Sequence, residues 1–136
     1  MKSIGRQTLL LFLLALLGLS STKLSAQSTE TERTAYAQIE DYANILFFAG
    51  AQEPAIGYLY YLYEAYPDQQ VRTAVPLASW LDLADRQSEA RELLQTLFTK
   101  KSDQAQDNQE LVRYYLTLLY SSGDINEADS LFALLP

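Results

Sequence analysis

The sequence feature that most constrains the fold is an amphipathic stretch framed by turn residues, GAQEPAIGYLYYLYEAYP, at Gly50–Pro67. Pro54 suits the first turn of a helix, where its missing N–H is no loss, and Pro67 cannot continue the helix that it follows. Between the two prolines, apolar residues recur at steps of four and three and share one helical face: Ala55, Leu59 and Leu62. The arrangement returns at residues 85–98 and 123–135, which indicates an internal helical repeat.

The same periodicity predicts six helices. They cover approximately residues 34–48, 53–66, 74–84, 88–99, 109–120 and 125–135. Residues 68–72 are expected to form a turn, and residues 100–108 a polar linker. Ser88 and Asp124 are the expected N-caps of the fourth and sixth helices, and Pro76 must lie in the first turn of the third helix or kink it. No stretch alternates at a period of two, so the predicted fold class is all-α.

Each predicted helix has an apolar face that we expect to be buried. The inward residues are Tyr36, Ile39, Tyr42, Ala43 and Leu46; Ala74, Leu77, Ala78 and Leu81; Ala90, Leu94 and Leu97; Val112, Tyr115, Leu116 and Leu119; and Ala128, Phe132 and Leu135.

The first 26 residues have the layout of a secretory signal peptide. Lys2 and Arg6 give a positive start, an apolar run covers residues 9–19, and small polar residues precede an expected cleavage after Ala26. The run is shorter than the roughly 20 residues of a transmembrane helix. The alternative is an anchor that stays attached. Residues 27–33 are polar and unpatterned, and we expect a flexible start there.

Charge and composition restrict the possible functions. Removal of the leader takes away three of the ten Lys and Arg residues and none of the 17 Asp and Glu residues, which leaves a net charge of −10. This charge disfavours nucleic acid, and we expect neutral or basic partners. The chain has no Cys and no His, which excludes Cys and His metal sites, Cys nucleophiles and serine mechanisms with a histidine base. We expect no cofactor, no metal and no enzymatic activity.

The spacing of the helical units resembles the tetratricopeptide repeat (TPR), W-x2-L-G-x2-Y, A-x3-F, P, over about 34 residues. The first-helix signature falls on Ile39, Tyr42, Ala43 and Leu46, then on Ala74, Leu77, Ala78 and Leu81, then on Val112, Tyr115, Leu116 and Leu119. The second-helix signature falls on Ala55, Leu59 and Pro67, then on Ala90 and Leu94, then on Ala128 and Phe132. An ordinary six-helix bundle with coincidental spacing remains the alternative.

The resemblance implies a short right-handed α-solenoid over residues 34–136, with repeats at about 36–69, 71–102 and 109–136. Small residues would let the helices approach closely: Ala43, Ala55, Ala78, Ala90 and Ala128. It also implies a peptide groove lined by the first helix of each pair. The groove candidates are Asn44, Phe47, Arg72, Ser79, Asp82, Arg113, Thr117 and Tyr120.

Five tyrosines crowd the second helix, and they cannot all face the core: Tyr58, Tyr60, Tyr61, Tyr63 and Tyr66. Exposed Tyr is favoured at interfaces, so these are candidate contact residues; the other interpretation is packing between helices with the hydroxyl in solvent. We therefore expect an exported, periplasmic or secreted scaffold that binds a polypeptide, with a homodimer through the last helix as a further possibility. The alternative is a small ligand-binding or inhibitor protein with an apolar pocket near Tyr58–Tyr66.

Overall fold

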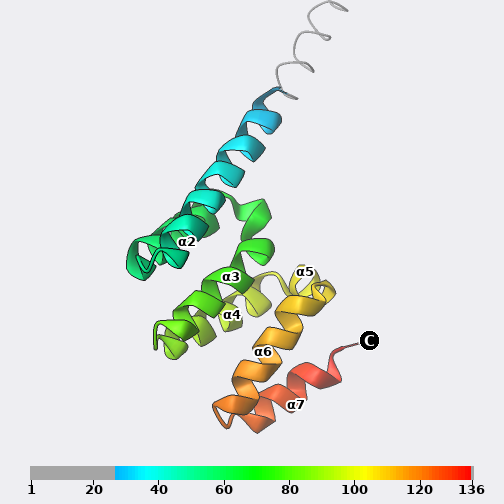
Figure 1. Ribbon diagram of the computed structural model, residues 1–136. Coiled ribbons are helices and arrows are strands. Elements are labelled where there is room, and N and C mark those ends of the chain that lie inside the picture. Colours follow the sequence, from blue (N-terminus) through cyan, green and yellow to red (C-terminus); the bar gives the residue numbers. More distant parts are fainter. Residues whose placement is uncertain (1–26, 136) are drawn as a thin grey trace, which may run out of the picture. The chain divides into compact units, whose positions relative to one another are not determined.

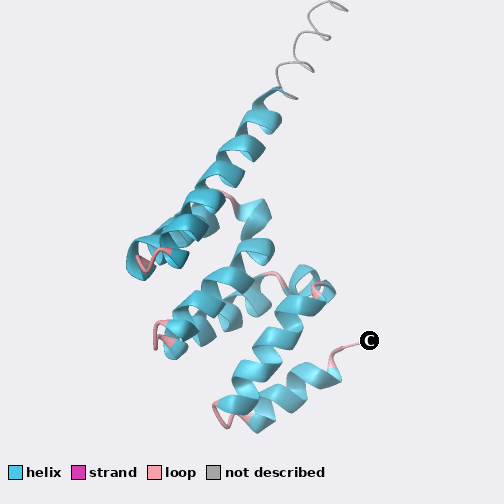
Figure 2. Ribbon diagram, in the orientation of Figure 1, coloured by secondary structure: helices cyan, strands magenta, loops and turns pink. Residues whose placement is uncertain are grey.

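The computed structural model describes residues 27–135, and every regular element in this range is helical (Figure 2). The all-α prediction is therefore confirmed for the described residues. The expected leader, residues 1–26, lies outside them.

The chain divides into two compact units, Met1–Gln38 and Ile39–Pro136. In the first unit, residues 27–38 are helical, and in the second, residues 39–48 are helical. The elements labelled in Figure 1 then follow, together with a 3-10 turn, η1. They are α2 (Gln52–Ala65), η1 (Pro67–Gln69), α3 (Gln70–Leu83), α4 (Gln87–Lys100), α5 (Ser102–Asp107), α6 (Gln109–Ser121) and α7 (Ile125–Ala133).

Helix α3 is the central element of the second unit. It packs against α2, α4 and α6, while α6 also contacts α4, α5 and α7. All four expected inward residues of α3, Ala74, Leu77, Ala78 and Leu81, are fully buried. The small residues of the repeat pattern are fully buried as well: Ala43, Ala55, Ala78, Ala90 and Ala128.

Three turns of the second unit share one backbone geometry. Each contains a residue with positive φ, namely Gly50 (88°), Asp85 (59°) and Gly123 (80°), 35 and then 38 positions apart. In each turn this residue donates its N–H to the carbonyl three positions earlier, and the next residue donates to the carbonyl five positions before itself, at N–O distances of 2.8–3.2 Å. These bonds satisfy carbonyls that the end of a helix leaves open. The spacing equals that of Ala55, Ala90 and Ala128.

Three segments differ from the prediction. Residues 27–33, expected to be an unpatterned start, are helical. The expected turn at residues 68–72 is replaced by η1 and the first turn of α3, which begins four residues earlier than predicted. The expected linker at residues 100–108 contains α5, whose single buried apolar side chain, Ala105, is too little for a periodicity argument to detect.

The structure also tests the predictions about helix ends. Pro76 lies well inside α3 and not in its first turn, so it has no N–H to donate along the helix. The predicted side-chain caps are wrong. Neither Ser88 nor Asp124 caps a helix through its side chain: Ser88 is already helical, and the Asp124 carboxylate pairs with Arg91 instead. Asn108 makes a side-chain cap, accepting the N–H of Leu111 at 3.0 Å.

Two expected core residues are exposed. Tyr42, on the helix of residues 39–48, and Phe132, on α7, both have large solvent-accessible fractions. On α7 the buried face contains Ala128 and Leu131 rather than Ala128 and Phe132. The helical period identified these positions as apolar, but burial also needs a neighbouring helix on that side.

The shared turn geometry predicts opposite effects of two substitutions. Asp85→Gly should stabilise the fold by roughly 0.5 kcal/mol, because Gly adopts positive φ without the Cβ crowding that Asp meets. Gly123→Ala should destabilise it by about 1 kcal/mol for the converse reason. Urea unfolding of both variants measures this, and a destabilised Asp85→Gly variant would contradict it.

Candidate functional site

Helix α2 carries two apolar faces. Ala55, Leu59 and Leu62 form the buried one. The second runs through Pro54, Tyr58 and Tyr61, at steps of four and three, so that these residues also lie on one side of the helix. A helix that is apolar on two sides normally has neighbours on both.

The second face of α2 borders an apolar hollow of about 430 Å³. It is lined by Ile39, Pro54, Gly57, Tyr58 and Tyr61, and both tyrosines are exposed. At its edge the ring of Tyr42 meets that of Tyr58 in a T-shaped contact with centroids 5.2 Å apart. The hollow is therefore an open aromatic depression, and we take it as the candidate site.

Gly57 lies in the interior of α2 and has no structural need to be glycine. Its φ is in the ordinary range, and a Cβ built on it would meet nothing within 4 Å. Glycine inside a helix costs about 0.5–1 kcal/mol relative to alanine. A residue that weakens the helix while keeping the hollow open is typical of a place where another molecule approaches closely.

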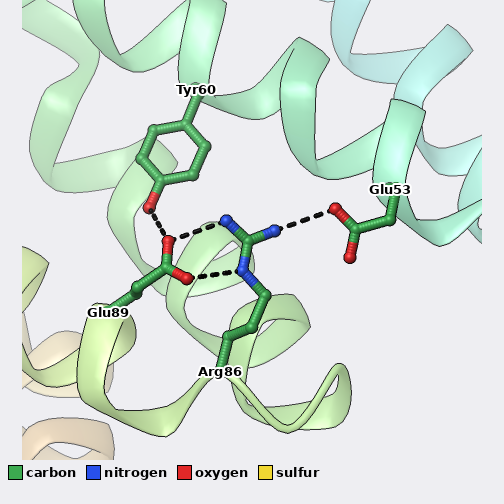
Figure 3. Close-up of polar contacts among 4 residues, drawn as sticks. All are labelled: Glu53, Tyr60, Arg86 and Glu89. Atoms are coloured by element: carbon green, nitrogen blue, oxygen red, sulfur yellow. Dashed lines mark hydrogen bonds and ion pairs between the residues drawn. The ribbon is translucent and has the colours of Figure 1, made fainter.

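The other three tyrosines of the α2 segment do not line the hollow. Tyr60 points towards α4, where its hydroxyl lies 3.4 Å from Oε2 of Glu89 (Figure 3). Tyr63 is half-buried, and burial raises the pKa of its hydroxyl. Tyr66 is half-buried beside η1. The five tyrosines grouped by the sequence analysis therefore belong to different surroundings.

A polar cluster links α2 to the start of α4 (Figure 3). Arg86 binds Glu89 with two hydrogen bonds of 2.7 Å and lies 3.0 Å from Oε2 of Glu53. The Glu89 hydrogen bond raises the pKa of Arg86, and the same bond lowers the pKa of Glu89. Burial, and then the charge of Glu89, raise the pKa of Tyr60. One guanidinium group thus contacts both carboxylates of the cluster, which makes it a link between helices.

A second cluster joins α4, α6 and α7. Arg91 Nη1 lies 2.5 Å from Oδ2 of Asp124, an atom that accepts no well-aligned hydrogen bond, so the ion pair alone compensates its charge. Arg91 Nη2 donates to Oε2 of Glu127 at 2.9 Å. The buried Tyr115 donates to the other oxygen of Glu127 at 2.6 Å. The first turn of α7 is thus held by charged groups as well as by apolar contacts.

The groove candidates from the sequence occupy separate places. Phe47 stacks on Trp80 at 4.2 Å between ring centroids, and Arg72 pairs with Glu40 at 2.6 Å. Ser79 and Asp82 lie near Tyr114. Burial, and next the charge of Asp82, raise the pKa of Tyr114 to about 12. Asn44 is partly exposed.

The remaining candidates are on α6. The Thr117 hydroxyl donates to the Arg113 carbonyl at 2.9 Å, and the exposed Tyr120 donates to Asp129 at 3.2 Å. Arg113 borders a second hollow of about 490 Å³ between α5 and α6, lined by both polar and apolar residues. Asp107 lines the same hollow and carries the opposite charge to Arg113.

Three of the five residues that line the aromatic hollow were not predicted as site residues: Ile39, Pro54 and Gly57. The spacing of Pro54, Tyr58 and Tyr61 was visible in the sequence and is the signal that identifies this face. Counting tyrosines obscured it, because Tyr60 and Tyr63 lie on another side of α2.

In residues 27–135 no group of three or more His, Cys, Asp and Glu side chains is placed to hold a metal ion. Two glutamates lie three residues apart on α4, Glu89 and Glu92, and Arg86 binds the first of them. Among the helices of the described part, none is both long and apolar enough to cross a membrane.

Comparison with known proteins gives no family assignment. No family model matches the sequence, and no curated protein sequence is detectably similar to it.

The Arg91 cluster predicts a pH dependence. The hydrogen bond from Tyr115, and next Arg91, lower the pKa of Glu127 from its ordinary value of 4.5. A carboxyl group with a lower pKa in the folded chain adds stability above its unfolded pKa, and that stability is lost as pH falls through the folded pKa. Glu127→Gln should therefore destabilise the protein at about pH 7 and make less difference at about pH 3. Urea unfolding at both pH values measures this.

Glu92→Gln, which removes an exposed carboxylate from α4, is the matched control for the general effect of losing one negative charge. An equal loss of stability at both pH values in Glu127→Gln would contradict the assigned role of the Glu127 carboxylate.

Proposed function

We propose that this protein is an exported, non-catalytic scaffold that binds a polypeptide partner through the aromatic hollow on α2. Its helices would form a short TPR-like solenoid of three pairs: residues 39–48 with α2, α3 with α4, and α6 with α7. The apolar hollow, kept open by Gly57, is the observation that carries the proposal.

Two features support the repeat arrangement. The left-handed turn residues and the buried alanines recur with the same spacings, so that the pairs share both their turn and their packing position. The helices α3 and α6 also pack against the preceding pair, as stacked repeats do.

Three properties of the hollow support a polypeptide as its ligand. It is open to solvent, so an extended chain or a helix can lie across it. Its two exposed tyrosines offer large contact area at low entropy cost. The exposed carboxylates Asp41 and Glu64, on the same two helices, favour a partner that is neutral or basic around its apolar contact.

A small apolar ligand is the second candidate, because the five lining residues present almost no polar surface. Ligand carriers usually enclose most of their ligand, whereas both tyrosines here are exposed. The openness of the hollow therefore favours the polypeptide. The leader-like composition of residues 1–26 supports the exported part of the proposal.

Gly57→Leu tests the hollow without damaging the fold. Leucine favours helix more than glycine does, and its Cβ would meet open space, so the variant should be as stable as the parent or more stable by about 0.5–1 kcal/mol. Its side chain would fill the hollow. In affinity capture with the purified protein as bait, we expect one defined polypeptide to be retained by the parent and lost by Gly57→Leu.

Leu83→Glu is the matched control, since Leu83 is an exposed apolar residue of α3 that does not line the hollow. Equal capture by the parent and Gly57→Leu would contradict the proposal. Loss of binding of an apolar fluorescent dye in Gly57→Leu, with no polypeptide captured by the parent, would favour the small-ligand alternative.

A further inference from the structure

Phe132 on α7 is exposed where the corresponding residues of the other pairs are buried. Nine residues after the left-handed turn residue stand Leu59 on α2, Leu94 on α4 and Phe132 on α7. Leu59 and Leu94 are buried, and their helices contact the pair that follows, through α3 and α6 respectively. Phe132 is 64% exposed. Among the described helices, none follows α7 to cover this position.

The opposite end of the second unit shows the complementary pattern. Each of the three left-handed turn residues is preceded by two large apolar residues. Those eight positions earlier are Tyr42, Leu77 and Tyr115, and those five positions earlier are Ile45, Trp80 and Leu118. The members of these sets on α3 and α6 are buried, whereas Tyr42 is 49% and Ile45 65% exposed. The exposed pair belongs to the first helical segment of this unit.

Ring contacts show what these positions meet inside the chain. Trp80 stacks on Phe47 of the preceding pair, and Tyr115 packs against Phe98 of α4 at 5.1 Å between centroids. The positions that correspond to Tyr42 and Ile45 therefore face the preceding pair. Phe47 stands three residues before its turn residue, and its counterpart on α6 is Tyr120, which is exposed.

The two ends of the unit thus carry the two halves of one interface. We call Tyr42 and Ile45 the leading face, and Tyr120 and Phe132 the trailing face. Inside the chain, the residues at the trailing positions of one pair, such as Phe47, contact the residues at the leading positions of the next, such as Trp80. A second copy of the chain offers both sets in the same arrangement.

We propose that the protein associates with itself end to end, with the trailing face of one copy packed on the leading face of the next. Such an interface uses two different surfaces and does not close on itself, so it builds open stacks rather than symmetric dimers. The proposal rests on the equivalence of the three pairs and goes beyond the binding of a partner at the hollow.

Apolar contact should drive this association while net charge opposes it. Both faces consist of large apolar side chains, and the sequence carries a formal net charge of −7. Added salt screens the repulsion between acidic copies and leaves apolar burial intact. Self-association should therefore strengthen as ionic strength rises.

Two exposed substitutions test the proposal. Ile45→Glu removes the leading face and Phe132→Glu the trailing face, and neither residue is buried or lines the hollow. In sedimentation velocity, the parent should form a concentration-dependent series of stacks. Each variant alone should associate at least roughly tenfold more weakly, because charge replaces a central apolar contact.

A mixture of the two variants gives the decisive readout. Ile45→Glu keeps an intact trailing face and Phe132→Glu an intact leading face, so the mixture should form one-to-one dimers and nothing larger. Leu83→Glu, an equally exposed substitution on α3, should stack as the parent does. Circular dichroism checks that all variants remain helical.

Several outcomes would overturn the proposal. A parent that stays monomeric over the accessible concentrations and salt range excludes it. Dimers that survive Ile45→Glu but not Phe132→Glu would indicate a symmetric contact through α7 instead. Gly57→Leu separates this test from the test of the hollow. Gly57 corresponds to Glu92 on α4, and Glu92 is exposed, so this position does not belong to the contact between pairs. The Gly57→Leu variant should therefore still stack, even where it no longer binds a partner at the hollow.

Discussion

The close approach of helices at small residues is the constraint on which the rest of this structure depends. Ala55, Ala90 and Ala128 have no exposed surface, and a larger side chain there would hold the helices apart. With no cysteine in the chain, cross-links cannot compensate for poor packing. The leucines beside these alanines can then reach the neighbouring helix, so the core consists of many modest contacts between successive helices.

Two arginines complement this apolar packing at the starts of α4 and α7. Arg86 connects α2 with α4, and Arg91 connects α4 with α7, each through two carboxylates. Exposed ion pairs contribute little individually, but a guanidinium fork bound by two partners restricts the angle between helices. The acidic character of the chain is thus partly structural, because these four carboxylates fix helix positions.

Much of the fold could be predicted from the sequence, because amphipathic periodicity depends on local geometry. The second, third and fifth predicted helices correspond to α2, α3 and α6, and Leu77, Leu94 and Leu119 are buried as expected. Phe132 and Tyr42 were misassigned because periodicity identifies an apolar side and not what covers it. Asp124 looked like a helix cap because its ion-pair partner, Arg91, lies 33 residues away in the sequence. The hollow could not be predicted, because it forms only when tertiary packing brings Ile39 and Gly57 together.

Pro76 gives the second unit a particular folding behaviour. Helix α3 packs against α2, α4 and α6, yet a proline in its interior makes it a poor helix in isolation. In stacked helical repeats, each repeat contacts only its neighbours, so individual repeats often fold one after another, as a one-dimensional Ising model describes. Helix α3 instead depends on the helices that pack against it, α2, α4 and α6, to compensate for the proline. The second unit should consequently lose its structure in a single cooperative transition, with no populated state in which only one end has melted.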